Sequence, residues 1–143
     1  MTAVSIITDT QLITQTESIP LYLDAVSAGF PSPASDHIDE QLDLNDYCID
    51  HPIASFLARV EGDSMCEAGI LEGDLLVVDR SLTAKSGDTI VAVYQGQFTV
   101  KELLTQPTPR LIPRNVMYPA IDIKSGDDFE VVGVVISVIR KLK

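Results

Sequence analysis

Residues 89–104 read TIVAVYQGQFTVKELL. Two runs rich in β-branched and aromatic residues flank Gln95 and Gly96. A two-residue connection that contains glycine is typical of a tight hairpin, because glycine adopts the positive φ angle that such a turn needs. We therefore expect residues 89–94 and 97–104 to form two paired strands. Lys101 lies inside the second strand, in a largely apolar run, where a lysine is unexpected.

The chain around this hairpin shows the same kind of pattern. Short β-branched runs, separated by Gly-Asp pairs, predict further strands at residues 55–60, 75–79, 110–113 and 129–139. The last run is apolar on both faces, so we expect a central, covered strand. Apolar spacing over residues 36–49 suggests one or two short helical turns, with Asp43 as a candidate cap and an end before Pro52. The predicted fold is a mostly β body.

The first 30 residues or so have a different composition. They are rich in Thr, Gln and Ser with scattered Ile and Leu, and we interpret them as an extended arm that ends at Pro31 and Pro33. The length of 143 residues suits one compact domain with a short appendage rather than two independent domains.

The charge is strongly negative and unevenly distributed. The formal net charge is −11, and nine Asp and Glu residues but no Lys or Arg precede Arg59. Such a chain repels a phosphate backbone, so we expect protein partners and no direct nucleic-acid binding. The N-terminus lacks the basic segment of a signal peptide, and no run of about 18 apolar residues occurs. These features predict a cytoplasmic protein without membrane contact.

The remaining polar residues indicate no cofactor and no metal. Cys48 and Cys66 lie in neither a CxxC nor a Cys/His spacing, so we expect no redox motif, no zinc site and no structural disulfide. Asp127 and Asp128 are interpreted as a solvated turn, and the chain has no glycine-rich phosphate loop.

Two features together suggest nucleophilic chemistry. Ser64 follows Gly62 and Asp63 directly after a predicted strand, and Lys101 lies in the hairpin. A serine hydroxyl needs a base to remove its proton, and a lysine can do so only as the free amine. Burial without a carboxylate partner lowers the pKa of a lysine and favours that form. We therefore predict a Ser64–Lys101 dyad, with the backbone amides of Asp63 and Ser64 as donors to the oxyanion.

Other interpretations of these residues exist. Gly-Asp-Ser is ordinary turn chemistry, and a strand lysine is more often an exposed edge residue. A histidine-based triad could use only His37 or His51, which we interpret as surface residues. Cys66 is a rival nucleophile, although an inert, partly buried thiol is the expected role.

An ordered series of segments resembles the LexA/UmuD family of self-cleaving Ser-Lys peptidases, from Gly29 almost to the end of the chain. The matching segments are Gly29-Phe30-Pro31-Ser32-Pro33-Ala34, Asp43-Leu44-Asn45, His51-Pro52, Gly62-Asp63-Ser64-Met65, Gly73-Asp74-Leu75-Leu76-Val77-Val78-Asp79, Gly87-Asp88, Phe98-Thr99-Val100-Lys101, Leu111-Ile112-Pro113 and Gly133-Val134-Val135-Ile136. Residues upstream of Asp24 resemble the family poorly.

The resemblance implies a strongly bent β body, a homodimer, and the roles of nucleophile for Ser64 and base for Lys101. It implies that the chain cuts its own Ala28–Gly29 bond when a RecA filament on single-stranded DNA stimulates it. An arm of residues 1–28 is then removed, and the domain of residues 29–143 joins a UmuC-type subunit as part of an error-prone translesion polymerase. Several family members have Cys where this chain has Ala28, but the side chain remains small.

Three alternatives differ in what they require. A LexA-type repressor needs a basic helix-turn-helix domain, which the first 28 residues, without Lys or Arg, do not supply. A signal peptidase shares the dyad chemistry but needs a membrane anchor. A non-catalytic binding module that docks to a polymerase would not need both Ser64 and Lys101.

Overall fold

The computed structural model describes residues 17–22, 25–30 and 38–143. Contacts divide the chain into two compact units, Met1–Tyr47 and Cys48–Lys143. The division after Tyr47 reflects contacts within the uncut chain, and it is distinct from the predicted cleavage between residues 28 and 29. The domain boundary at that bond stays a prediction. Pro31, Pro33 and His37 lie outside the described residues.

In the first unit, β1 (Ile19–Tyr22) pairs antiparallel with β2 (Ile38–Leu42). Residues 38–42 are therefore a strand and not part of the one or two helical turns predicted over residues 36–49, because pairing with β1 overrides the apolar spacing that suggested a helix. The short helix α2 (Leu44–Cys48) follows, and the Asp43 carboxylate accepts a 2.9 Å hydrogen bond from the amide of Asn45. This contact confirms Asp43 as the cap.

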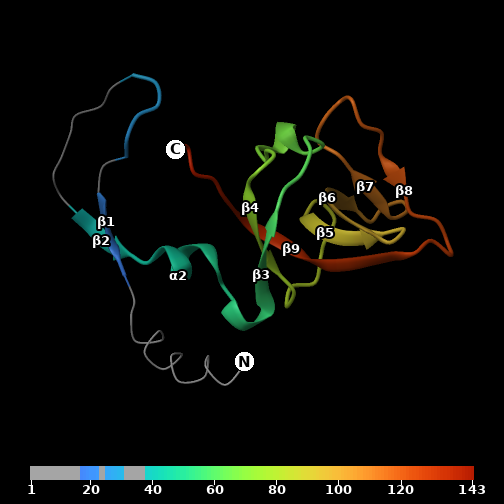
Figure 1. Cartoon of the computed structure of the whole chain (residues 1–143), viewed down its shortest axis with the longest axis horizontal. Helices are drawn as coiled ribbons and strands as arrows, with labels where there is room; N and C mark the ends of the chain where they lie inside the picture. Colours follow the sequence, from blue (N-terminus) through green and yellow to red (C-terminus); the bar gives the residue numbers. More distant parts are fainter. Residues whose placement is uncertain (1–16, 23–24, 31–37) are drawn as a thin grey trace. The chain divides into compact units, whose positions relative to one another are not determined.

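The second unit is built on one seven-stranded antiparallel sheet, which confirms the mostly β prediction (Figure 1). Its strand order is β3-β4-β9-β5-β6-β7-β8. The strands are β3 (Ser55–Arg59), β4 (Leu75–Asp79), β5 (Thr89–Tyr94), β6 (Gln97–Leu104), β7 (Arg110–Ile112), β8 (Ile121–Asp122) and β9 (Phe129–Ile139). Two 3₁₀ turns, Pro52–Ala54 and Cys66–Ala68, flank β3. The short β8 was not predicted.

The hairpin of β5 and β6 has the predicted register and turn. Tyr94 pairs with Gln97, and the two residues between them have φ angles of 50° at Gln95 and 79° at Gly96. Positive φ at both central positions is the signature of a type I′ turn, whose twist matches that of the flanking strands. Lys101 stands opposite Ile90, which is fully buried.

Strand β9 lies between β4 and β5, so the predicted central strand is confirmed. Its register shifts once against each neighbour, and such irregularities bend a strand. A side chain at Gly133 would place its Cβ 2.7 Å from a Val78 methyl group and 2.9 Å from the Asp79 carbonyl oxygen. Glycine therefore permits the close approach of β9 to β4.

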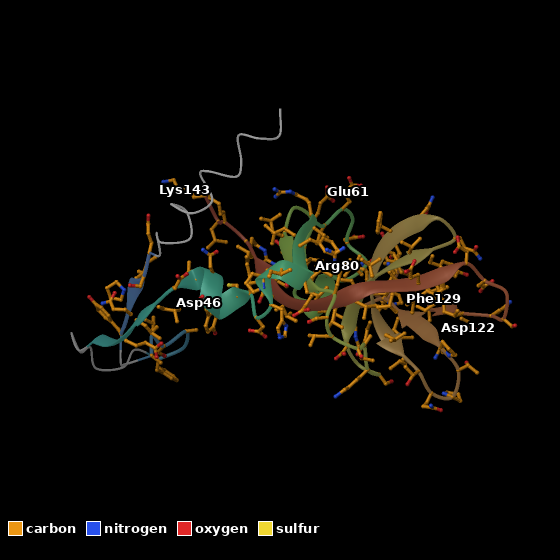
Figure 2. The ribbon with its side chains drawn as sticks, turned by 90° about the horizontal axis from the view of Figure 1, so that it is seen from below. Asp46, Glu61, Arg80, Asp122, Phe129 and Lys143 are labelled. Atoms are coloured by element: carbon orange, nitrogen blue, oxygen red, sulfur yellow. The ribbon has the colours of Figure 1, made fainter. Side chains whose placement is uncertain are left out.

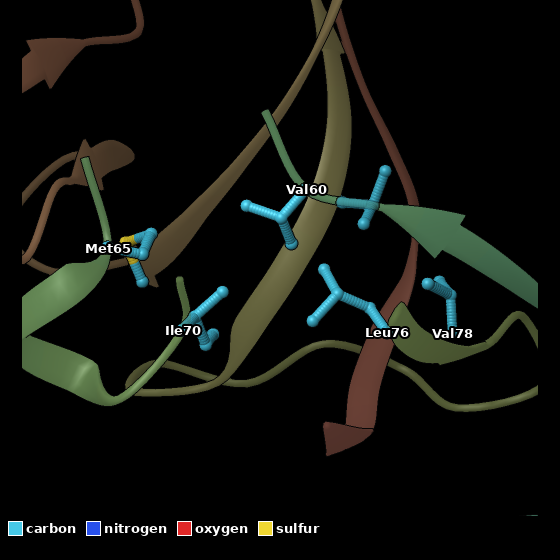
Figure 3. Close-up of a cluster of buried hydrophobic side chains, with 6 residues drawn as sticks. Val60, Met65, Ile70, Leu76 and Val78 are labelled. Carbon is cyan, nitrogen blue, oxygen red and sulfur yellow. The ribbon is translucent and has the colours of Figure 1, made fainter. Parts of the chain in front are cut away.

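Two hydrophobic clusters fill the body. The first, seen in Figure 3, consists of buried Val60, Met65, Ile70, Leu76, Val78 and Val91. The second consists of Ile90, Ala92, Leu103, Leu111 and Val134. Phe129, which is labelled at the start of β9 in Figure 2, packs against it. The first cluster matters for the site, because Met65 is the residue directly after Ser64.

Candidate active site

Ser64 lies in a turn shortly after β3. Within the turn, the amide of Cys66 donates a 3.2 Å hydrogen bond to the Asp63 carbonyl oxygen. Met65 is only 2% exposed and anchors the turn in the first cluster, whereas Ser64 is half-buried. The core therefore holds the turn by one side chain and leaves the neighbouring hydroxyl within reach of other groups.

Strand β6 brings Lys101 to this hydroxyl. The Lys101 Nζ lies 3.1 Å from Ser64 Oγ, 2.7 Å from Thr99 Oγ1 and 3.2 Å from the Val100 carbonyl oxygen. In the described part of the chain, no carboxylate forms an ion pair with Lys101. Burial lowers the pKa of Lys101 from its ordinary value of 10.5. The surroundings thus favour a neutral amine that can accept the serine proton.

A cleft of about 260 Å³ opens beside this pair. Most of its lining comes from the end of β3 with the residues after it and from the first half of β6. The lining residues are Ala58, Arg59, Val60, Glu61, Ser64, Leu76, Val91, Phe98, Thr99, Val100 and Lys101. The cleft is mostly apolar with a few polar groups near Ser64, as is usual for a binding site.

The predicted oxyanion donors are the amides of Asp63 and Ser64. Among the described residues, neither amide donates a hydrogen bond to a protein acceptor, whereas the Asp63 carbonyl oxygen accepts two hydrogen bonds and the Ser64 carbonyl oxygen accepts one. Free amides next to a nucleophile are available to an incoming oxygen. Their role stays a prediction.

The predicted cleavage pair, Ala28 and Gly29, lies in the first unit. Both residues are exposed, and residues 28–30 form a bend in which the Gly29 amide donates a 3.2 Å hydrogen bond to Ser27 Oγ. Exposure of a small, flexible pair is compatible with cleavage, which stays a prediction.

His51 has partners that the sequence interpretation did not anticipate. Its Nδ1 lies 2.6 Å from Asp79 Oδ2 and 3.2 Å from Ser81 Oγ, and Asp79 is fully buried. The hydroxyl of Ser81 also donates to Asp79, at 2.6 Å. In a catalytic triad the carboxylate and the serine contact opposite nitrogens of the imidazole. Here both contact Nδ1, so the cluster lacks the geometry of a triad.

The remaining candidates play local roles. Cys48 and Cys66 are free thiols. Asp127 accepts a 2.8 Å hydrogen bond from the Lys124 amide, in keeping with the predicted turn. Within the described ranges, no group of three or more His, Cys, Asp and Glu residues is arranged to hold a metal ion. None of the helices in those ranges is long and apolar enough to cross a membrane.

Sequence reasoning missed a second group of residues at the site. Asn115 and Tyr118 both contact Asp63, and Thr99 contacts the amine of Lys101. The one signal in the sequence was an asparagine and a tyrosine between Pro113 and Pro119, a segment bounded by two prolines, which ordinarily indicates a loop. The contacts themselves depend on tertiary structure.

Comparison with known proteins agrees with this geometry. Residues 20–136 match the family model described as Peptidase S24-like. Protein MucA of Salmonella typhimurium is 48% identical over 119 residues, 82% of this chain and 82% of MucA. Protein SamA of Salmonella typhimurium strain LT2 is 44% identical, over 87% of this chain and 86% of SamA. A LexA repressor of Paracidovorax citrulli is 37% identical, over 85% of this chain and 54% of the repressor.

The chain therefore belongs to the peptidase S24-like family. Within it, the chain is a UmuD-like member of the LexA/UmuD group, as the sequence resemblance indicated. Its general class is that of a self-cleaving serine peptidase.

Proposed function

We propose that this chain is an autopeptidase of the SOS response, with Ser64 as nucleophile and Lys101 as base, which cleaves its own Ala28–Gly29 bond. The observation that carries the proposal is the 3.1 Å approach of Lys101 Nζ to Ser64 Oγ beside a cleft, in a chain of the peptidase S24-like family. A neutral amine at this distance can take the hydroxyl proton as oxygen attacks.

The proposed reaction has two steps, formation of an ester on Ser64 and hydrolysis of that ester. Ser64 Oγ bonds to the Ala28 carbonyl carbon while its proton passes to Lys101 Nζ, and the amides of Asp63 and Ser64 donate to the oxyanion. The C–N bond to Gly29 then breaks, and the Gly29 nitrogen takes the proton from Lys101, which leaves an ester between Ser64 and Ala28. Water, deprotonated by Lys101, hydrolyses the ester, releases residues 1–28 with a terminal carboxylate and restores Ser64.

The cleft suits an extended substrate. β3 is an edge strand of the sheet, and Ala58 to Glu61 at its end line the cleft. A free strand edge accepts an extended peptide through main-chain hydrogen bonds. The segment around Ala28 has small residues at the bond to be cut, so it can approach the serine without bulky side chains in the way.

The partners follow from the family. We propose that a RecA filament on single-stranded DNA stimulates cleavage, and that the processed chain, as a homodimer, becomes the accessory subunit of an error-prone translesion polymerase with a UmuC-type subunit. The net charge of −11 supports contacts with proteins rather than directly with DNA, and we propose a cytoplasmic location for the complex.

The test is conversion of the purified full chain. Wild type is incubated at alkaline pH and, separately, with RecA, ATP and single-stranded DNA, and the products are identified by mass spectrometry. We expect a fragment that begins at Gly29 from wild type and none from Ser64→Ala. The matched control is Ser81→Ala, because Ser81 also lies beside a basic side chain, yet outside the cleft.

Two outcomes would contradict the proposal. Cleavage of Ser64→Ala at the same bond would exclude Ser64 as the nucleophile. No fragment from wild type under either condition would favour the alternative of a non-catalytic module that binds a polymerase.

A further inference from the structure

The turn that carries Ser64 is held from one side by residues 114–118, which follow β7; we call them the bracing segment. The backbone contacts are reciprocal. The amide of Arg114 donates to the Ser64 carbonyl oxygen at 2.7 Å, and the amide of Glu67 donates to the Arg114 carbonyl oxygen at 2.9 Å. The nucleophile turn and the bracing segment are therefore joined on both sides of Met65.

Two side chains of the bracing segment converge on Asp63. Asn115 Nδ2 donates to the Asp63 carbonyl oxygen at 2.9 Å, and the Tyr118 hydroxyl donates to Asp63 Oδ1 at 2.6 Å. Asn115 is itself held, because its Oδ1 accepts a 2.9 Å hydrogen bond from the Met117 amide. Asp63 is thus fixed through both its main chain and its side chain.

These contacts bear on the oxyanion donors through the planarity of the peptide group. The Asp63 carbonyl and the Ser64 N–H belong to one rigid, trans peptide unit and point in opposite directions. A group that fixes the Asp63 oxygen therefore also fixes the direction of the Ser64 N–H. The hydrogen bond from Tyr118 restrains the Asp63 side chain and thereby the orientation of the same unit.

We propose that Asn115 and Tyr118 are positioning residues, which hold the Asp63–Ser64 peptide so that its N–H faces the developing oxyanion. The inference rests on the proposed catalytic role of Ser64. Neither side chain contacts the reacting atoms, so both act through Asp63. Donors that are oriented before the reaction stabilise the transition state without the cost of reorganisation.

The Tyr118 hydroxyl can donate to Asp63 only while it is protonated. Its hydrogen bond to the Asp63 carboxylate, together with the charge of that group, raises the pKa of Tyr118 above its ordinary value of 10.0, and Cys66 adds to the effect. Glu67, the other acidic group of the turn, faces the amide of Val116 instead. The two pKa shifts therefore have opposite directions, and they favour a pH range in which the Lys101 amine is neutral and the Tyr118 hydroxyl is still protonated.

The test measures the self-cleavage rate of the full chain against pH for Tyr118→Phe and Asn115→Asp. Tyr118→Phe removes only the donor to Asp63, and Asn115→Asp keeps the acceptor for Met117 while losing the donor to Asp63. The matched controls are Tyr47→Phe and Asn45→Asp, both at exposed positions of α2. We expect each test variant to lower the plateau rate at high pH about tenfold or more, and the controls to leave it unchanged.

The pH profile separates positioning from general damage. Tyr118→Phe changes no charge, so its midpoint should equal that of wild type, because Lys101 is untouched. A loosened site would hydrate Lys101 and move the midpoint up, and that result would overturn the inference. The inference would also be overturned if Tyr118→Phe and Asn115→Asp both kept the plateau rate of wild type. If one variant fails to fold, as judged by thermal unfolding, the plateau rate of the other decides.

Wild type and Ser64→Ala are measured in parallel. If wild type is not cleaved, or if Ser64→Ala is, the proposed function fails. If both behave as expected while the two variants keep the wild-type plateau, only the positioning role fails.

Discussion

Lys101 and His51 are both basic side chains next to a serine, but their surroundings shift their pKa values in opposite directions. Lys101 contacts Ser64 and Thr99 and has no carboxylate partner among the described residues, so burial lowers its pKa. His51 contacts the buried Asp79 carboxylate, which raises its pKa through a hydrogen bond and through its charge. A base without a counter-ion is kept neutral and can accept a proton.

The opposite pKa shifts of Lys101 and His51 suit the Lys101–Ser64 pair and the His51–Asp79–Ser81 cluster to different roles. Hydrogen bonds from Ser81 and then His51 lower the pKa of Asp79 to about 2, so its carboxylate is ionised at neutral pH and favours the protonated form of His51. The cluster joins the segment before β3 to the end of β4. We therefore expect the His51 cluster to contribute to stability and the Lys101 pair to contribute to chemistry.

The largest expected effect comes from removing each base. Lys101→Met should reduce self-cleavage by about 10³ or more, because Ser64 loses the group that takes its proton. His51→Gln should leave the rate within about twofold of wild type, since His51 lies outside the cleft. Fragment yields over time, measured by gel densitometry, check both. An equal loss of self-cleavage rate in Lys101→Met and His51→Gln would contradict the assignment of chemistry to Lys101 alone.

The pH dependence of wild type is the next largest effect. Only neutral Lys101 can act as base, so the rate should rise about tenfold per pH unit and then level off below the ordinary lysine pKa of 10.5. Rate constants without RecA, measured from about pH 7 to about pH 10, give the midpoint. A flat profile would show that lysine deprotonation does not control the reaction.

Thr99→Asp should convert the Lys101 site into one that resembles the His51 site. Thr99 Oγ1 lies 2.7 Å from the amine, so an aspartate there places a carboxylate beside it. An opposite charge at such a distance raises a lysine pKa, by about 1 unit or more, and the midpoint should move to higher pH by that amount. Thr99→Asn, which adds no charge, is the control. A midpoint shared by both variants would contradict the electrostatic explanation.

The smallest effect concerns stability. Because the folded pKa of His51 is raised, its pairing with Asp79 stabilises the fold fully below pH 6.5 and loses this effect as pH rises through the folded value. Because the folded pKa of Asp79 is lowered from 3.8 to about 2, the stabilisation also disappears as pH falls through that range. Urea unfolding of wild type and His51→Gln should differ most between pH 3.8 and pH 6.5. A difference independent of pH would rule out charge pairing.

Much of the fold could be predicted because its strands have strong local patterns. The β5–β6 hairpin, the central β9 and the cap at Asp43 follow from turn chemistry, apolar runs on both faces and a short polar side chain before a helix. The one or two helical turns predicted over residues 36–49 included Ile38–Leu42, which is a strand. Its pairing with Ile19–Tyr22 was missed because such short segments carry little pattern that indicates a strand.

The candidate site also has a part that the sequence predicts and a part that depends on tertiary structure. Ser64 and Lys101 were recognisable from their local surroundings and from the order of segments shared with the family. The 3.1 Å contact between them, 37 positions apart, and the contacts of Asp63 with Asn115 and Tyr118, 52 and 55 positions away, arise only when β6 and the segment after β7 pack beside the nucleophile turn.

Local pattern was therefore sufficient for β3, β4, β5, β6, β7 and β9 and for the β5–β6 turn, but not for β1, β2 or β8. Backbone preference and side-chain periodicity act over a few positions, and the shortest segments carry too little of either. Folding was needed to establish that the pKa of Lys101 is lowered and that of His51 is raised. The pKa of a lysine or a histidine depends on the burial and the charges that distant segments bring to it, and neighbours in the chain do not reveal these.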